Sequence, residues 1–333
     1  GFAPVREWLA EQKPDLLFYV YNDHVTSFFF DNYSNFALGF SDTWPVADEG
    51  GGPRALPALE GHPAFAKHAA LGLVADEFDL SFFQAKGLDH GVFSPLSMML
   101  AHEGGWPTKL VPLQVGVLQF PIPTARRCFA LGRSIRKAIQ SYPEDMNVVV
   151  VGSGGMSHQV HGERAGFNNT DWDMEFLELL ENDPEKLTEF SISEFAERGG
   201  VEGAEIIMWL IMRGALSRKV NKVHQSYCLP TMTATGTVIY EDLSDTDDAA
   251  NAEAWLARAR REFTGVTGLS GSYPFDFDSS SRAYRLNKYL HGIIQPELRG
   301  RFLYDREGSY ERGGLTEEEK NMLTNLDWAA LLR

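Results

Sequence analysis

The sequence has few cysteines and lacks long apolar runs, and these two features exclude several classes of protein. It contains two cysteines, Cys128 and Cys228, in 333 residues. That is too few for a disulfide framework or for a zinc site made of thiolates, and it indicates a reducing, cytoplasmic compartment. No apolar run approaches the roughly 20 residues that cross a bilayer, so no membrane span is predicted. Charged residues interrupt the amino-terminal stretch, which excludes a signal peptide there.

Basic residues are also scarce. The chain has 30 Lys and Arg against 46 Asp and Glu, a formal net charge of −16. This charge would repel a phosphate backbone, so the sequence predicts no nucleic-acid partner and no anionic membrane partner. The 44% hydrophobic content, 31 Gly and 16 Pro are ordinary for a packed protein, and they exclude disorder over most of the chain.

Strands and helices alternate over the first two thirds of the sequence. Three short apolar runs predict buried strands, at 15–21, 110–118 and 147–151. Three longer patterns predict helices, at 63–73, 125–141 and 201–216, the last of them apolar on all sides. The alternation predicts a large α/β domain over 1–240, with a central sheet flanked by helices.

The composition changes near residue 240. Glu241–Glu253 holds six acidic residues and no basic one, which predicts an acidic linker region at 241–272. Beyond it, 273–333 contains only helical patterns and predicts a smaller all-helical domain. The chain starts at Gly1 inside a helical pattern and stops at Arg333 without a terminal signal, so we expect both ends of a longer polypeptide to be missing.

Two residues stand where metal chemistry would be expected. His24 directly follows a predicted strand, and open α/β sheets bind ligands at the carboxyl ends of their strands. Glu205 enters the apolar helix, where a carboxylate is costly to bury unless it is paired or metal-bound. Structural roles stay open for both, because His24 suits an ordinary turn and the helix dipole favours a glutamate in a first turn.

Two further histidines lie in predicted loops. The cluster Gly152–Gly155 follows a strand, but it matches neither a phosphate-binding loop nor a nucleophile elbow. It predicts a flexible loop that presents Ser157 and His158, and His90 is predicted to lie in a second loop of the same kind. Imidazoles and a carboxylate without thiolates suit an open site for non-haem Fe(II) or for catalytic Zn²⁺, and these residues alone do not choose between the metals.

Several segments, in the same order, resemble the class III extradiol dioxygenases. They include YVYNDH, ADEGGGPR, LDHGVFSPLS, GSGGMSHQVHGERAGFNN, EGAEIIMWLIMRGAL and SYCLPTMTA. The resemblance covers 1–240 and is strongest to the members that cleave gallate, with the protocatechuate-cleaving members next. The tail at 282–328 resembles the small α subunit of the latter, and its presence on the same chain is the gallate-cleaving arrangement.

This resemblance implies a non-haem Fe(II) enzyme that opens the ring of gallate to 4-oxalomesaconate, with O₂ as co-substrate, in a cytoplasmic homodimer. The site residues that it implies are the metal ligands His24 and Glu205, the catalytic residues His158 and His90, and Asn22 and Thr233 beside the ligands and the substrate. In such a site, histidine can accept and return a proton near neutral pH.

The resemblance also implies that part of the site lies outside the sequence. The family's other iron-binding histidine belongs to a Ser-His-Thr-Pro-like segment that precedes the match to Gly1, and its last helices follow the match to Arg333. Three alternatives remain at this point: protocatechuate as the substrate, a zinc hydrolase on a similar site, or a metal-free binding protein that retains the fold.

Overall fold

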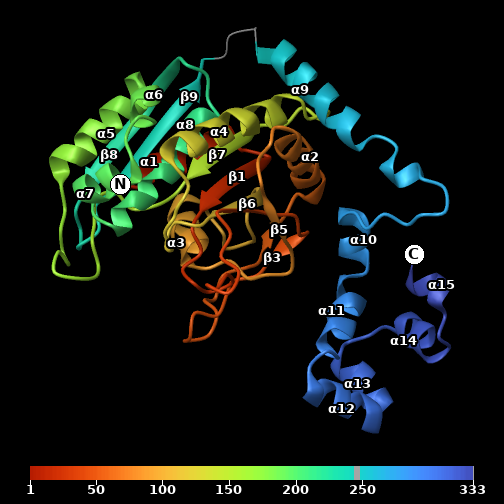
Figure 1. Cartoon of the computed structure of the whole chain (residues 1–333). Coiled ribbons are helices and arrows are strands. Elements are labelled where there is room, and N and C mark those ends of the chain that lie inside the picture. The colour runs from red at the N-terminus through yellow and green to blue at the C-terminus, as the bar shows by residue number, and fades with distance from the viewer. Residues whose placement is uncertain (244–247, 333) are drawn as a thin grey trace. The chain divides into compact units, whose positions relative to one another are not determined.

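Three parallel strands form the centre of the main sheet in the computed structural model, which describes residues 1–243 and 248–332 (Figure 1). Strand β1 (Leu16–Tyr21) lies between β6 (Lys109–Val115) and β7 (Val148–Gly152). All six residues of β1 are buried, because helices cover both faces of the sheet. The three predicted strands are confirmed.

The sequence did not predict the remaining strands, which are short or polar. β2 (Phe36–Gly39) and β5 (Ser81–Phe83) complete a five-stranded sheet in the order β5-β2-β6-β1-β7, with β2 antiparallel to β6. The other four strands form two separate antiparallel pairs, each made of strands that are consecutive in the sequence. They are β3 (Thr43–Trp44) with β4 (Leu59–Glu60), and β8 (Val220–Cys228) with β9 (Thr235–Asp242).

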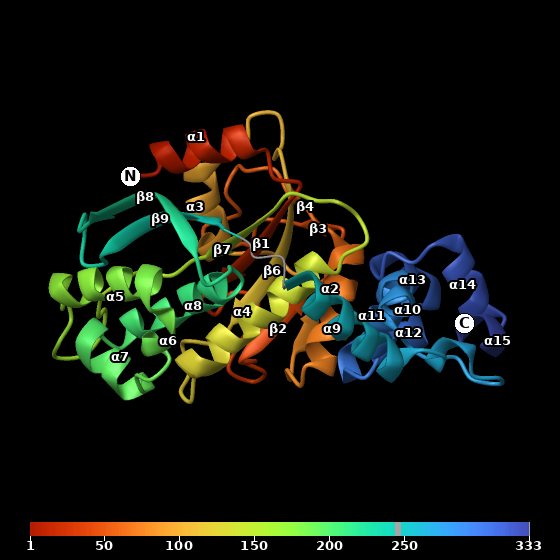
Figure 2. The same ribbon diagram turned by 90° about the horizontal axis from the view of Figure 1, so that it is seen from above.

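Helices cover the two faces of the sheet in separate layers (Figure 2). On one face, α1 (Ala3–Gln12) and α3 (His90–Met99) pack on an apolar cluster that includes Leu17, Tyr19 and Tyr21. The other face carries α2 (Pro63–Ala75), α4 (Ala125–Gln140) and α8 (Ile207–Gly214). The predicted α/β fold with flanking helices is therefore confirmed. Every residue of α8 is buried, as its apolar sequence indicates.

Three helices lie beside the β8–β9 hairpin (Figures 1 and 2). These are α5 (Thr170–Asn182), α6 (Pro184–Leu187) and α7 (Ile192–Gly199). A turn of 3₁₀ helix, η1 (Glu202–Ile206), leads from α7 into α8 and carries Glu205. Ion pairing between Lys222 of β8 and Glu181 of α5 joins the hairpin to this group of helices.

The chain divides into two compact units, Gly1–Glu262 and Phe263–Arg333. In the second unit, all the described secondary structure is helical, and it has a small core of Leu286, Tyr310 and Leu315. Its elements are η2 (Val266–Gly268), α10 (Phe277–Arg282), α11 (Tyr284–Gly292), α12 (Pro296–Tyr304), α13 (Arg306–Arg312), α14 (Glu317–Thr324) and α15 (Trp328–Leu331). Among the described residues, no helix is both long and apolar enough to cross a membrane.

The region 241–272, for which the sequence predicts an acidic linker, contains helix α9 (Asp248–Phe263). Trp255 of this helix is buried, and a Cβ added to Gly72 of α2 would lie 1.8 Å from its ring. Only glycine at position 72 leaves room for the indole. The Nε1–H of Trp255 also donates to Asp76 at 3.1 Å, and Arg258 pairs with the same carboxylate. The domain boundaries at 240 and 272 remain predictions.

The Trp255 contact predicts a measurable contribution to stability. Trp255→Ala should lower the free energy of unfolding by about 3–5 kcal/mol, because it empties the space beside Gly72 and leaves Asp76 without the indole donor. Urea unfolding followed by circular dichroism measures this change. Arg261→Ala on the exposed side of α9 is the matched control, with an expected change within about 0.5 kcal/mol. If Trp255→Ala lost no more stability than this control, the proposed contribution of the Trp255–Gly72 contact would be wrong.

Candidate active site

A cavity of about 760 Å³ opens where β1 and β7 end. Because the two strands are parallel neighbours, the residues that follow them lie side by side. Asn22 and His24 line the cavity after β1, and Gly152–Gly155 lines it at the end of β7. His90 from α3 and Glu205 from η1 complete this part of the wall. The cavity thus collects four of the six predicted site residues.

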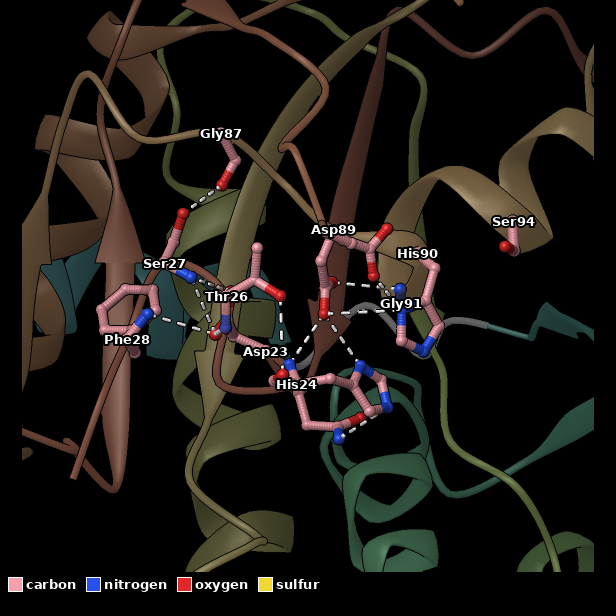
Figure 3. A network of polar contacts seen from close by, with 12 residues as sticks. Asp23, His24, Thr26, Ser27, Phe28, Gly87, Asp89, His90, Gly91 and Ser94 are labelled. Carbon is pink, nitrogen blue, oxygen red and sulfur yellow. Dashed lines mark hydrogen bonds and ion pairs between the residues drawn. The ribbon is translucent and has the colours of Figure 1, made fainter. Parts of the chain in front are cut away.

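The orientation of His24 is set by Asp89 (Figure 3). Asp89 is fully buried and accepts hydrogen bonds from the backbone N–H of His24 at 2.7 Å and from its Nδ1 at 2.8 Å. A carboxylate can only accept, so Nδ1 carries a proton, and in the neutral ring Nε2 keeps its lone pair. Burial alone would lower the pKa of His24, but the hydrogen bond and charge of Asp89 raise it overall.

A second buried carboxylate shapes the turn that follows His24 (Figure 3). Asp23 accepts hydrogen bonds from the backbone N–H groups of Thr26, Ser27 and Phe28, at 2.8 to 3.1 Å. Val25 lies inside this turn with a φ of 59°, a left-handed conformation that is costly for a β-branched residue. The bonds to Asp23 stabilise the strained turn, which keeps the backbone of His24 at the cavity.

His90 does not lie in a loop, contrary to the sequence-based prediction. It is the first residue of helix α3, because the Asp89 side chain caps the helix through the N–H of Gly91. Its ring stacks on that of His24 with centroids 3.9 Å apart, and its Nδ1 is bonded to Glu49. Arg54 pairs with the other oxygen of Glu49 at 3.1 Å. Glu49 therefore fixes the ring of His90 from the side opposite to the cavity.

Glu205 is buried against the glycine loop that follows β7. Its Oε1 accepts a hydrogen bond from the backbone N–H of Gly155. A Cβ on Gly155 would lie 2.7 Å from Thr233, 3.0 Å from His158 and 3.1 Å from Glu205, so only glycine lets these side chains meet. Burial raises the pKa of Glu205, and neither His158 nor the Gly155 N–H fully offsets it. The carboxylate would gain from a nearby cation.

His158 lies directly behind Glu205. Its Nδ1 donates to the carbonyl of Met156 at 2.7 Å, so the proton is on Nδ1 and Nε2 is free. Nε2 lies 3.8 Å from Oε1 of Glu205, and the residue is almost completely buried. His24, His90 and His158 thus share one arrangement, in which an acceptor holds Nδ1.

Two donor sets could bind a metal ion here. His24, Asp89 and His90 offer ligand atoms within 4.8 Å of one another. However, both oxygens of Asp89 already accept hydrogen bonds, from His24 and from Gly91. Nε2 of His24 and the buried carboxylate of Glu205 face the same cavity, and the charge of Glu205 raises the pKa of His24. An imidazole, a carboxylate and open space suit a transition metal such as iron or zinc.

The other predicted residues take different places. Asn22 lines the cavity, with its Nδ2 3.3 Å from Nε2 of His24. Thr233 lies in the turn between β8 and β9 beside Gly155, and it is Thr235 that lines the cavity. The prediction that the loop presents Ser157 is wrong. Ser157 is buried, and its Oγ donates to the carboxylate of Asp173.

Comparison with known families adds to this geometry. Residues 1–240 match the model of the catalytic LigB subunit of aromatic ring-opening dioxygenases. The chain belongs to this dioxygenase family. Residues 286–333 match the LigA subunit of the aromatic-ring-opening dioxygenase LigAB. The predicted resemblance is therefore confirmed, and membership in the family implies a metal and O₂.

Curated relatives of this dioxygenase carry related names. Gallate dioxygenase of Pseudomonas putida is 52% identical over 287 residues, which cover 86% of this chain and 84% of that protein. A 2,3-dihydroxyphenylpropionate/2,3-dihydroxicinnamic acid 1,2-dioxygenase of Mycobacterium ulcerans is 24% identical, covering 65% of this chain and 81% of its own. Among solved structures, the uncharacterized protein JW3007 of Escherichia coli K12 superposes with a TM-score of 0.47 at 15% identity, covering 70% of this chain and 90% of its own.

The carboxylates that orient His24 and His90 of this dioxygenase are not evident from its sequence. Asp89 precedes His90 at the start of a helical pattern, and an aspartate in that position is a helix-capping signal. That signal could have placed His90 on a helix. Nothing in the sequence indicates that Asp89 would reach His24, 65 positions away, or that Glu49 would reach His90. These contacts depend on tertiary structure.

The role of Asp89 predicts an effect on metal binding. Asp89→Asn leaves one oxygen, which can accept the Nδ1–H of His24 or the N–H of Gly91 but not both, and it removes the negative charge. We therefore expect the affinity for Co²⁺ to fall by about 10–100-fold. Isothermal titration measures it. Asp48→Asn in a neighbouring exposed loop is the control and should leave the affinity unchanged. A loss far beyond that range would instead make Asp89 a direct ligand.

Proposed function

We propose that this dioxygenase uses Fe(II) and O₂ to open the ring of gallate beside its hydroxyl groups, inserting both oxygen atoms to give 4-oxalomesaconate. The observation that carries the proposal is the placement of His24 and Glu205 on the wall of one cavity, with His158 packed directly behind Glu205, 3.8 Å from its carboxylate. The 52% identity to a gallate dioxygenase over most of both chains supports the choice of substrate.

In this proposal, Nε2 of His24 and the carboxylate of Glu205 hold the metal. Bound Fe(II) would bring the substrate hydroxyls and O₂ together and allow electron density to pass between them. Asp89 orients His24 by accepting its Nδ1–H. A bound cation would also offset the cost of burying the Glu205 carboxylate, because burial without a cation raises the pKa of this group.

His158 is the proposed acid–base residue. Because Met156 holds the proton on Nδ1, Nε2 can accept a proton from a substrate hydroxyl and return it later in the reaction. His90 lies on the other side of the site, stacked on His24, where it would face the substrate and O₂. Asn22 lies on the cavity wall beside His24, and its amide would release Nε2 of His24 when the metal binds and then face the substrate. Thr233 is proposed to approach the substrate carboxylate from the hairpin turn.

The alternatives receive less support. The family match to ring-opening dioxygenases favours oxygen chemistry over both zinc hydrolysis and metal-free binding. Protocatechuate remains the competing substrate, because it carries the same hydroxyl pair. We also propose a cytoplasmic homodimer, as the family resemblance implies, and light scattering on the native polypeptide tests the dimer.

Oxygen uptake tests the substrate. The native polypeptide, reconstituted with Fe(II) under anaerobic conditions, should consume one O₂ per gallate. Its kcat/KM for gallate should exceed that for protocatechuate by more than about tenfold, because a site that hydrogen-bonds a hydroxyl discriminates against its absence. Uptake that is equal for the two acids would contradict gallate specificity. Metal binding without uptake for any catechol would contradict the proposed activity.

Substitutions separate the ligands from the acid–base residue. His24→Ala and Glu205→Gln should lose bound metal together with activity, whereas His158→Gln should keep its metal and lose turnover by about 10²–10⁴-fold. His161→Ala is the matched control, because His161 is exposed on the same loop and bonds only to Glu202 among the described contacts. Metal content per chain and steady-state rates are the measurements. Full metal occupancy in both ligand variants would show that the ligands are wrong.

A further inference from the structure

A fourth buried carboxylate lies next to the proposed acid–base residue and is not on the wall of the cavity. Asp173 is in the first turn of α5 and is fully buried. It accepts hydrogen bonds from the backbone N–H of Ser157 at 2.8 Å, from the Ser157 Oγ at 2.6 Å and from the Tyr227 hydroxyl at 2.8 Å. Burying a carboxylate is costly, and these three donors offset much of that cost.

Ser157 links Asp173 to His158, which is the next residue in the chain. Its Oγ also accepts the backbone N–H of Asn169 at 2.8 Å, and its carbonyl accepts the side chain of Asn168 at 2.7 Å. The carbonyl further accepts the N–H of Ala234 at 3.2 Å. Every polar group of Ser157 is therefore bonded, which fixes the peptide that leads into His158.

The backbone on both sides of Ser157 is held as well. The N–H of Met156 donates to the carbonyl of Ala234 at 2.9 Å, and that of His158 donates to Gly199 at 2.8 Å. Met156 in turn supplies the carbonyl that holds Nδ1 of His158. Asp173 is the charged centre of this arrangement, because it ties the glycine loop to α5 and, through Tyr227, to strand β8.

We propose that Asp173 is a positioning residue for His158, which fixes the imidazole at Glu205 by way of Ser157 and the carbonyl of Met156. The inference rests on the proposed acid–base role of His158. It assigns Asp173 no contact with substrate or metal, since it lies behind the loop and not on the cavity wall. Its removal should therefore reduce turnover without reducing the binding of either.

Asp173→Asn is the first test. Asparagine retains an oxygen for the N–H of Ser157. Its NH₂ group, however, takes the place of the oxygen that accepts the hydroxyl protons of Ser157 and Tyr227, and an NH₂ group cannot accept them. We expect kcat with gallate to fall by about 10–100-fold, while KM and metal content stay within about twofold of the parent. Asp171→Asn is the matched control, because Asp171 is an exposed acid in the same helical turn, with the same relation to the helix dipole.

A double-mutant cycle with His158→Gln distinguishes positioning from general destabilisation. If Asp173 acts through His158, Asp173→Asn should have little further effect on kcat once the imidazole is gone. An equal further loss in that background would overturn the proposal, and so would an unchanged kcat in the single variant. Parent polypeptide that opens no catechol ring would overturn the proposed function instead.

Tyr227→Phe keeps the test informative if Asp173→Asn does not fold. It removes one of the three donors to Asp173 and leaves the carboxylate and both Ser157 bonds in place. A smaller fall in kcat is expected, again with unchanged KM and metal content and again absent in the His158→Gln background. A fall of the same size in both backgrounds would contradict the proposed link to His158.

Discussion

The burial of Glu205 is the constraint on which the rest of the site depends. Its carboxylate lies among apolar residues of η1 and α8, and burial raises its pKa. Such a group is stable only where cations or donors face it. The absence of a side chain at Gly155 lets a backbone N–H and His158 approach it, and the pairing of β1 with β7 places His24 across the cavity. A metal cation between His24 and Glu205 would neutralise the buried negative charge of Glu205.

Hydrogen bonds at Nδ1 give the imidazoles of the site their separate roles. His24 and His90 are held by carboxylates, whereas His158 is held by a neutral carbonyl. A carboxylate partner makes an imidazole a better donor to a metal, and a carbonyl leaves it free to exchange a proton. In the proposed function, His24 would therefore bind the metal and His158, packed behind Glu205, would exchange the proton.

Local sequence patterns predicted the long elements and the residues at their ends. The apolar runs of β1 and β7 located His24 and the glycine loop, since a parallel strand buried on both faces has an unmistakable pattern. The hairpin of β8 and β9 was missed because its strands are half exposed and polar. The partners Asp89, Glu49 and Asp173 could not be predicted, because each reaches its histidine or serine across distant parts of the chain.

The location of the metal is the most direct test of this account. Anomalous diffraction from crystals of the Fe(II)-loaded native polypeptide, grown without O₂, would place the ion relative to the two donor sets. We predict an ion at about 2.0–2.2 Å from Nε2 of His24 and from a carboxylate oxygen of Glu205, with Asp89 bonded only to the far side of His24. An ion bound by Asp89 and His90, away from Glu205, would contradict it.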